Sequence, residues 1–96
     1  MAAYIIVDVE VADPDLYAEY KQLVPATLEP YGGRFLCRGG VMERLEGDWK
    51  PARVVILEFD SVEQARGWWS STEYAAPKAL RQRSARSNMI LVEGVD

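Results

Sequence analysis

The side chains of this chain that could bind or transform a ligand are its carboxylates, arginines and aromatic residues. The sequence contains no histidine and one cysteine, Cys37. That composition excludes an internal disulfide, Ser-His and Cys-His nucleophile pairs and most zinc sites. We therefore expect no metal site and no bound cofactor, and we interpret Cys37 as a buried, unreactive thiol. The absence of histidine also removes the commonest general base.

Four charged residues fall on one face of the sheet that the sequence predicts: Asp8, Arg38, Glu58 and Glu93. If the central hairpin turns near Asp48, Arg38 and Glu58 lie opposite each other and can form a cross-strand ion pair that sets the register of a dimer. Alternatively, the charges line a pocket in which Arg38 binds an anionic ligand. Asp8 or Glu58 is then the catalytic base, with a pKa raised by burial and by neighbouring carboxylates. Solvated charges at the periphery are the third interpretation.

Aromatic side chains on the two predicted helices form a second candidate site. Tyr17 and Tyr20 belong to the first helix, and Trp69 and Tyr74 to the second, where they can reach the gap between helices and sheet. Aromatic residues at helical spacing are usually core residues. Because a buried tyrosine hydroxyl needs a hydrogen-bond partner, one or two of them can instead line a small polar cavity. The ligand-binding candidates are therefore Arg38, Tyr20, Trp69 and Tyr74.

The elements that must position these residues follow from the periodicity of the sequence. Residues 4–11 alternate in period two, which predicts a strand. Asp13-Pro14-Asp15 supplies an N-cap and a first turn for a helix, which Gly32-Gly33 ends. Residues 34–45 form the second predicted strand, with a bulge or bend at Gly39-Gly40.

The second half of the chain has the same order of strand, helix and strand, after a turn at Gly47-Asp48. The βαββαβ order predicts one α+β domain, residues 1–96, with the ferredoxin-like layout: a four-stranded antiparallel sheet with two helices on one face. The predicted segments are a strand at 53–59, a helix that starts at the Ser61 capping box and restarts at Ser71 or Thr72, and a strand at 89–95.

Two helices cover only one face of such a sheet, so the two faces should differ in composition. Seven large apolar residues share the uncovered face with the four charges, which is more than monomers usually expose. A second copy stacked sheet on sheet about a twofold axis would bury them, so we predict a homodimer. The helix face comprises Ile5, Val7, Val9, Phe35, Cys37, Val55, Leu57, Phe59, Ile90 and Val92, and the seven of the open face are Tyr4, Ile6, Leu36, Val54, Ile56, Met89 and Leu91.

The net charge of −4 disfavours nucleic-acid binding. One basic cluster is interpreted as cations in the last turns of a helix, which the macrodipole favours, with a patch for an anion or a nucleic acid as the alternative. No apolar run approaches the length of a membrane span, and the N-terminus lacks the features of a secretory signal, so we expect a cytoplasmic protein. The basic cluster consists of Lys78, Arg81, Arg83 and Arg86.

Five short segments in order carry a resemblance to one known family: residues 32–36 (GGRFL), 38–40 (RGG), 46–53 (EGDWKPAR), 69–74 (WSSTEY) and 93–94 (EG). They resemble the uncharacterised family numbered 1330 among the domains of unknown function, in the dimeric α+β barrel superfamily. The resemblance implies the ferredoxin-like fold and a homodimer whose two sheets form a barrel. It implies little about activity, because the superfamily includes cofactor-independent monooxygenases, muconolactone isomerase-like enzymes, haem proteins and ligand-binding regulatory domains. The haem proteins need an axial histidine, which this chain lacks.

Functions of different classes remain open at this point. The first is a small homodimeric enzyme that acts by proton transfer on a small organic acid or aromatic metabolite, with Arg38 binding the anion and Asp8 or Glu58 as the base. The alternative is a noncatalytic dimer that binds or senses a small molecule. The third is a structural or interaction module without a ligand.

Overall fold

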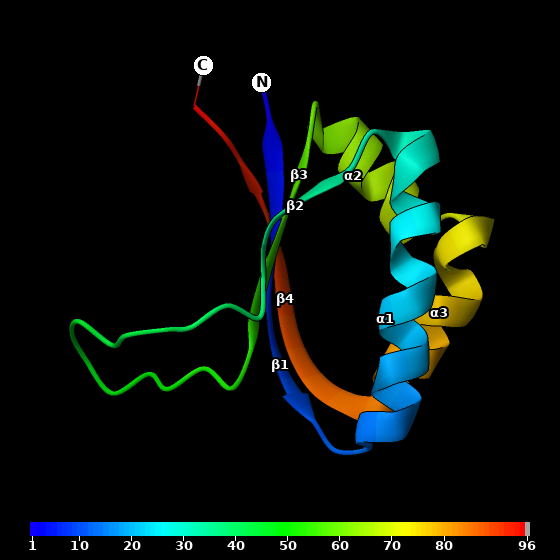
Figure 1. Cartoon of the computed structure of the whole chain (residues 1–96). Helices are drawn as coiled ribbons and strands as arrows, with labels where there is room; N and C mark the ends of the chain where they lie inside the picture. The colour runs from blue at the N-terminus through cyan, green and yellow to red at the C-terminus, as the bar shows by residue number, and fades with distance from the viewer. Residues whose placement is uncertain (96) are drawn as a thin grey trace.

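A four-stranded antiparallel sheet carries the helices on one face and leaves the other face open (Figure 1). The computed structural model describes residues 1–95. The elements are β1 (Ala3–Val11), α1 (Pro14–Leu28), the 3-10 turn η1 (Glu29–Tyr31), β2 (Arg34–Arg38), β3 (Val54–Phe59), α2 (Val62–Trp69), α3 (Thr72–Ser84) and β4 (Ala85–Glu93). The strand order β2-β3-β1-β4, with every pair antiparallel, confirms the predicted ferredoxin-like α+β fold.

α1 begins where the sequence predicts, because Asp13 caps it. The Asp13 carboxylate accepts a hydrogen bond of 3.1 Å from the amide of Leu16, and Pro14 is the first helical residue. Beyond η1, Gly32 ends the helical segment in the left-handed conformation, with φ of 69°. The helix is thereby held so that Tyr17 and Tyr20 are buried against the sheet.

The second helical region is broken into α2 and α3, and each part has its own cap. The Ser61 hydroxyl accepts a hydrogen bond of 3.1 Å from the amide of Gln64. The Ser71 hydroxyl accepts one of 3.1 Å from the amide of Tyr74 and donates one of 2.8 Å to the carbonyl of Trp68. Both caps satisfy backbone groups that helix ends leave free. Of the two predicted restart positions, the structure uses Ser71, and this cap turns Tyr74 into the core.

The side chains of the last strand point to the opposite faces of the sheet from those predicted. β4 starts at residue 85 rather than 89, and in its register with β1, Val7 pairs with Met89. Residues 89–92 are all apolar, so their alternation does not indicate which of them face the helices; the pairing with β1 does. The helix face therefore gains Met89, Leu91 and Glu93, and the open face gains Ile90 and Val92.

The second strand is shorter than predicted. β2 ends at Arg38 rather than near Leu45, and residues 39–53 leave the sheet as a long excursion that we call the arm. Figure 1 shows the arm projecting away from the helices, on the side of the open face. The register shift in this strand lies between Phe35 and Cys37, not at Gly39-Gly40.

Because of this register shift, the side chains at the end of β2 lie on the opposite face of the sheet from the one predicted. Cys37 pairs with Ile56 of the open face, and Arg38 pairs with Val55, which is buried beneath the helices. The predicted faces of both residues are therefore wrong. Arg38 was expected on the open face and lies on the helix side, whereas Cys37 was expected on the helix face and lies half-buried on the open face. A bulge inserts one extra residue, so every side chain after it changes face.

Candidate functional site

A small cavity of about 30 Å³ lies between the helices and the sheet. Its walls are mostly valine, leucine and aromatic side chains, and its ionisable lining residues are cations and tyrosines. Charges in such surroundings interact more strongly than in water because the local dielectric is low. The space is therefore suited to an anion. We call it the arginine cavity, and its ionisable lining residues are Tyr17, Tyr20, Lys21, Arg38, Arg53 and Arg81.

Arg81 is the most deeply placed of these cations, with only 4% of its surface exposed. Its Nε donates a hydrogen bond of 3.3 Å to the hydroxyl of Tyr74, which lies 2.9 Å from the hydroxyl of Tyr20. Tyr74 and Arg81 are seven residues apart on α3, two turns along one helical face, so the helix itself brings them together. The result is a buried chain of one guanidinium and two phenols.

The Tyr20 phenol is neutral in the folded protein. Burial raises the pKa of Tyr20 because a tyrosinate would be poorly solvated there, and the hydrogen-bonded Tyr74 hydroxyl raises this pKa further. Tyr20 therefore keeps its proton and can donate it in a hydrogen bond to a ligand. A second layer holds Tyr74 in place: its ring stacks on that of Trp68, with centroids 3.9 Å apart, and the Trp68 indole donates to the Thr27 hydroxyl at 3.0 Å.

Arg53, the last residue of the arm, contributes a guanidinium whose buried Nε has no hydrogen-bond partner. The guanidinium carbon lies 5.6 Å from the centroid of the Tyr17 ring. A side chain on Gly39 would collide with this guanidinium, and Gly39 also has a positive φ of 71°. The two ends of the arm thus meet beside the arginine cavity, and they leave an unsatisfied donor there, which is rare for a buried group.

Arg38 lies at the margin of the same cavity. Its Nη2 donates a hydrogen bond of 2.6 Å to the carbonyl of Lys21, and its guanidinium lies 4.3 Å from the centroid of the Phe35 ring. These contacts link the end of β2 to α1. They leave Arg38 exposed, so it can meet a ligand at the entrance rather than at the buried end.

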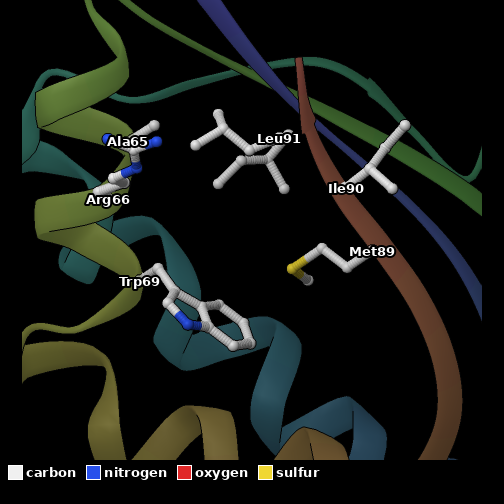
Figure 2. Close-up of a pocket in the computed structure, with 7 residues that line it drawn as sticks. Ala65, Arg66, Trp69, Met89, Ile90 and Leu91 are labelled. Carbon is white, nitrogen blue, oxygen red and sulfur yellow. The ribbon is translucent and has the colours of Figure 1, made fainter.

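A second, larger space of about 170 Å³ opens between α2 and β4, and we call it the slot. Figure 2 shows the Trp69 ring from the helix side and the Met89 sulfur from the strand side pointing toward one another across it. Met89 lines both the slot and the arginine cavity. The slot is lined by Ile5, Ala65, Arg66, Trp69, Met89, Ile90 and Leu91.

The ligand-binding candidates from the sequence come together on the helix side of the sheet. Tyr20 and Tyr74 are hydrogen-bonded, the Trp69 and Tyr74 ring centroids are 6.2 Å apart, and Arg38 lines the same cavity as Tyr20. The predicted helix–sheet pocket thus exists as a space. Whether these residues bind a ligand stays a prediction.

The two candidate bases lie on the open face instead. Glu58 accepts a hydrogen bond of 2.7 Å from Nε of Arg34, so the expected pairing of Glu58 with Arg38 is wrong. Asp8 accepts hydrogen bonds from the Trp49 indole at 3.2 Å and the Ala52 amide at 3.0 Å. Both carboxylates are therefore separated from Arg38 by the thickness of the sheet, and their catalytic roles stay predictions.

Sequence reasoning missed Arg53 and Arg81 as site residues. The sequence shows Arg81 only as one of several cations at the end of a helix, although its spacing from Tyr74 already places the two on one face. Arg53 gave no comparable signal, because only the closure of the arm brings it to the cavity.

Within residues 1–95, the single thiol and the side chains of metal-binding type add no metal site. The Cys37 thiol lies 3.8 Å from the carbonyl of Val54. Among residues 1–95, no three side chains of metal-binding type lie close enough together to hold an ion. Over the same residues, no helix has the length and apolar character needed to cross a membrane.

The chain belongs to the family described as a domain of unknown function (DUF1330), whose match covers residues 2–95. No curated protein matches the sequence. The resemblance to this family, which the sequence motifs indicated, is thereby confirmed, and so is the fold that it implied.

Solved structures of similar fold are 10–23% identical to this chain, so they show the fold alone. A protein of unknown function from Rhodopseudomonas palustris is 23% identical, with a TM-score of 0.75 over 99% of this chain and 83% of that one. SnoaB of Streptomyces nogalater, described as a cofactor-independent oxygenase, is 10% identical, with a TM-score of 0.68 over 99% and 94%. A protein of unknown function from Thermobifida fusca, described as dimeric and ferredoxin-like, is 13% identical, with a TM-score of 0.65 over 98% and 92%.

Proposed function

We propose that this member of the DUF1330 family binds a small organic acid, with the carboxylate of the ligand in the arginine cavity. The observation that carries the proposal is the burial of Arg81, which is 4% exposed beside two phenols rather than beside a carboxylate. A buried guanidinium without an anionic partner costs free energy. The ion pairs recorded among residues 1–95 both involve Arg34, on the other side of the sheet. A ligand carboxylate would supply the missing partner.

The donors around the cavity match the acceptors of a carboxylate. Arg81, the unpartnered Nε of Arg53 and the neutral Tyr20 hydroxyl all donate hydrogen bonds, and a carboxylate has two oxygens that only accept them. Charge-assisted hydrogen bonds of this kind are about twice as strong as neutral ones. The arrangement therefore favours an acid over its neutral amide or alcohol.

The geometry supports binding better than it supports proton abstraction. The carboxylates nominated as bases, Asp8 and Glu58, lie on the open face, where they bond Trp49 and Arg34. The groups that line the arginine cavity stabilise an anion instead. We accordingly place noncatalytic binding of a small molecule first, and an enzyme acting without a bound cofactor second.

Benzoate and benzamide, which differ in charge but hardly in shape, form the test. We expect benzoate to raise the melting temperature, because a ligand that binds only the folded state stabilises it, and benzamide to have no effect. Arg81→Met should weaken benzoate binding at least about tenfold, while Arg83→Met, an exposed control on the same helix, leaves it unchanged.

Equal stabilisation by both compounds, or full benzoate binding by Arg81→Met, would contradict the proposal. Conversion of benzoate during the same titration, followed by proton NMR of the ligand, would move the enzyme hypothesis to first place.

We also propose that two copies pair through the open face of the sheet. That face exposes Leu36, Ile90 and Val92. The arm adds three apolar residues that are each at least 65% exposed: Val41, Leu45 and Trp49. A groove of about 740 Å³ runs between the arm and the sheet. An apolar surface of this extent is unusual on a monomer, and stacking of two sheets would bury it. The similar protein from Thermobifida fusca is described as dimeric, which supports this arrangement.

A further inference from the structure

We infer that the slot between α2 and β4 holds an aromatic ring of the same ligand, so that the ligand is an aryl-substituted carboxylic acid. This inference rests on the proposed function, because the carboxylate is taken to lie in the arginine cavity. It adds the chemical class of the ligand and names the residues that select it.

The slot has the size and lining of a site for a single ring. Its volume is about 170 Å³, and Ile5, Ala65 and Leu91 form an apolar floor. An apolar cavity of about 150 Å³ is enough to accept benzene. The slot opens to solvent beside β4, an edge strand of the sheet, so a ligand can enter without any displacement of the helices.

A ring is a better occupant than an alkyl chain because of the two side chains that face each other across the slot. Trp69 presents an indole that is 38% exposed, and the thioether of Met89 approaches from the opposite strand (Figure 2). A flat ring between them makes an aromatic contact on one side and a sulfur–aromatic contact on the other. An alkyl chain gains neither.

Met89 also connects the slot to the arginine cavity, since its side chain lines both. Methionine is unbranched and changes rotamer readily, so a ligand can pass it without a shift of the backbone. The Trp69 ring centroid lies 6.0 Å from the guanidinium carbon of Arg81. Trp69 therefore borders both the slot and Arg81, and we take the carboxylate of a ring held against Trp69 to bind that guanidinium.

Arg66 offers a competing position for the carboxylate. It lines the slot on the solvent side, and its exposed guanidinium could hold an acid whose ring points inward. An exposed arginine gains less from an ion pair than a buried one does, because water screens the attraction. We therefore place the carboxylate at Arg81 and treat Arg66 as the control.

The experiment compares acetate, hexanoate and phenylacetate in titrations of the full chain followed by protein NMR. We expect phenylacetate to bind at least about tenfold more tightly than acetate, and hexanoate to lie between them. Leu91→Phe fills the slot and should remove the advantage of phenylacetate while leaving acetate binding unchanged. Leu23→Phe, the same substitution on an exposed site of α1, should change neither affinity. Arg66→Gln tests the competing position of the carboxylate and should retain the advantage of phenylacetate over acetate.

Trp69→Ala provides a second variant in case Leu91→Phe does not fold, since Trp69 is partly exposed and its truncation is better tolerated. It should lower phenylacetate affinity and spare acetate. The inference is overturned if a folded slot variant still binds phenylacetate more tightly than acetate by the full factor. It is also overturned if Arg66→Gln abolishes that difference in affinity. Equal binding of phenylacetate and acetate by the unmodified protein overturns the inference but leaves the proposed function intact, whereas failure of every acid to bind overturns both.

Discussion

Arg81 and Tyr20 show what burial does to a side chain that would be unremarkable on the surface. Arg81 carries its charge into a space walled by aromatic and aliphatic groups, and Tyr20 keeps its proton there because a buried tyrosinate would be poorly solvated. Together they form a set of hydrogen-bond donors. This is why we propose that the cavity binds an anion.

Tyr20→Phe should change how stability depends on alkaline pH. The pKa of Tyr20 is raised above the ordinary value of 10.0, chiefly by burial. The folded chain therefore holds this proton more tightly than the unfolded chain, so the stabilisation is fully present below pH 10.0 and is lost as pH rises from there toward the folded pKa. We expect the free energy of unfolding to fall more steeply above pH 10.0 in the unmodified protein than in the variant.

Urea denaturation followed by tryptophan fluorescence on both sides of pH 10.0 measures this difference. At neutral pH the variant should lose about 1 kcal/mol, because the hydroxyl of Tyr74 loses one of its two hydrogen-bond partners and keeps only Arg81. Parallel pH profiles for the two proteins would contradict the assignment of Tyr20 as the buried phenol.

Residues of the arm make contacts on both faces of the sheet. On the open face, Asp8 accepts hydrogen bonds from Trp49 and Ala52 and so ties down the end of the arm. On the helix side, Gly39 leaves room for the guanidinium of Arg53 beside the arginine cavity. A change at the base of the arm should therefore be felt in the cavity.

Gly39→Ala and Gly40→Ala form a matched pair that tests this connection. Gly39 has a positive φ of 71°, and an added side chain would strike Arg53, whereas nothing lies within 4 Å of the position of a Cβ on Gly40. We expect Gly39→Ala to cost about 1–2 kcal/mol of stability and to weaken benzoate binding. Gly40→Ala should leave both unchanged within error.

Thermal unfolding and benzoate titration of the two variants provide the measurement. If Gly39→Ala binds benzoate as well as the unmodified protein does, Arg53 has no part in the site.

At the scale of the whole molecule, the helices bury one face of the sheet, and the open face is the surface that we propose pairs with a second copy. Ile56 lies near the centre of that face, paired with Ile6, and both line the groove beneath the arm. Ile56→Glu would place a charge in the proposed interface, where an unpaired charge is costly. We expect the unmodified protein to be a dimer and this variant to be a monomer.

Size-exclusion chromatography with light scattering measures the mass of each species. Leu23→Glu is the control, because Leu23 is exposed on α1 on the opposite side of the molecule. A monomeric unmodified protein would contradict the proposed dimer, and a dimeric Ile56→Glu would show that another surface is used.

Local sequence signals predicted the fold well, since each acts over a few residues. The caps at Asp13, Ser61 and Ser71 are where their side chains indicated, because a hydroxyl or carboxylate bonds an amide only three residues away. The prediction failed in β2 and β4, where the bulge and the run of apolar residues 89–92 leave the orientation undecided. There the pairing with a distant strand decides which side chains are buried.

The sequence by itself determined the order of elements, the absence of histidine and the surplus of apolar residues for one sheet face, because these depend on residue type and short-range spacing. It also marked Tyr20, Tyr74, Trp69 and Arg38 as residues to examine. Only the tertiary structure decided that Arg38 faces the helices, that Arg81 and Arg53 lie beside it, and that Asp8 and Glu58 lie on the opposite face. The physical reason is that the face to which a strand residue points follows from long-range pairing, which one inserted residue reverses.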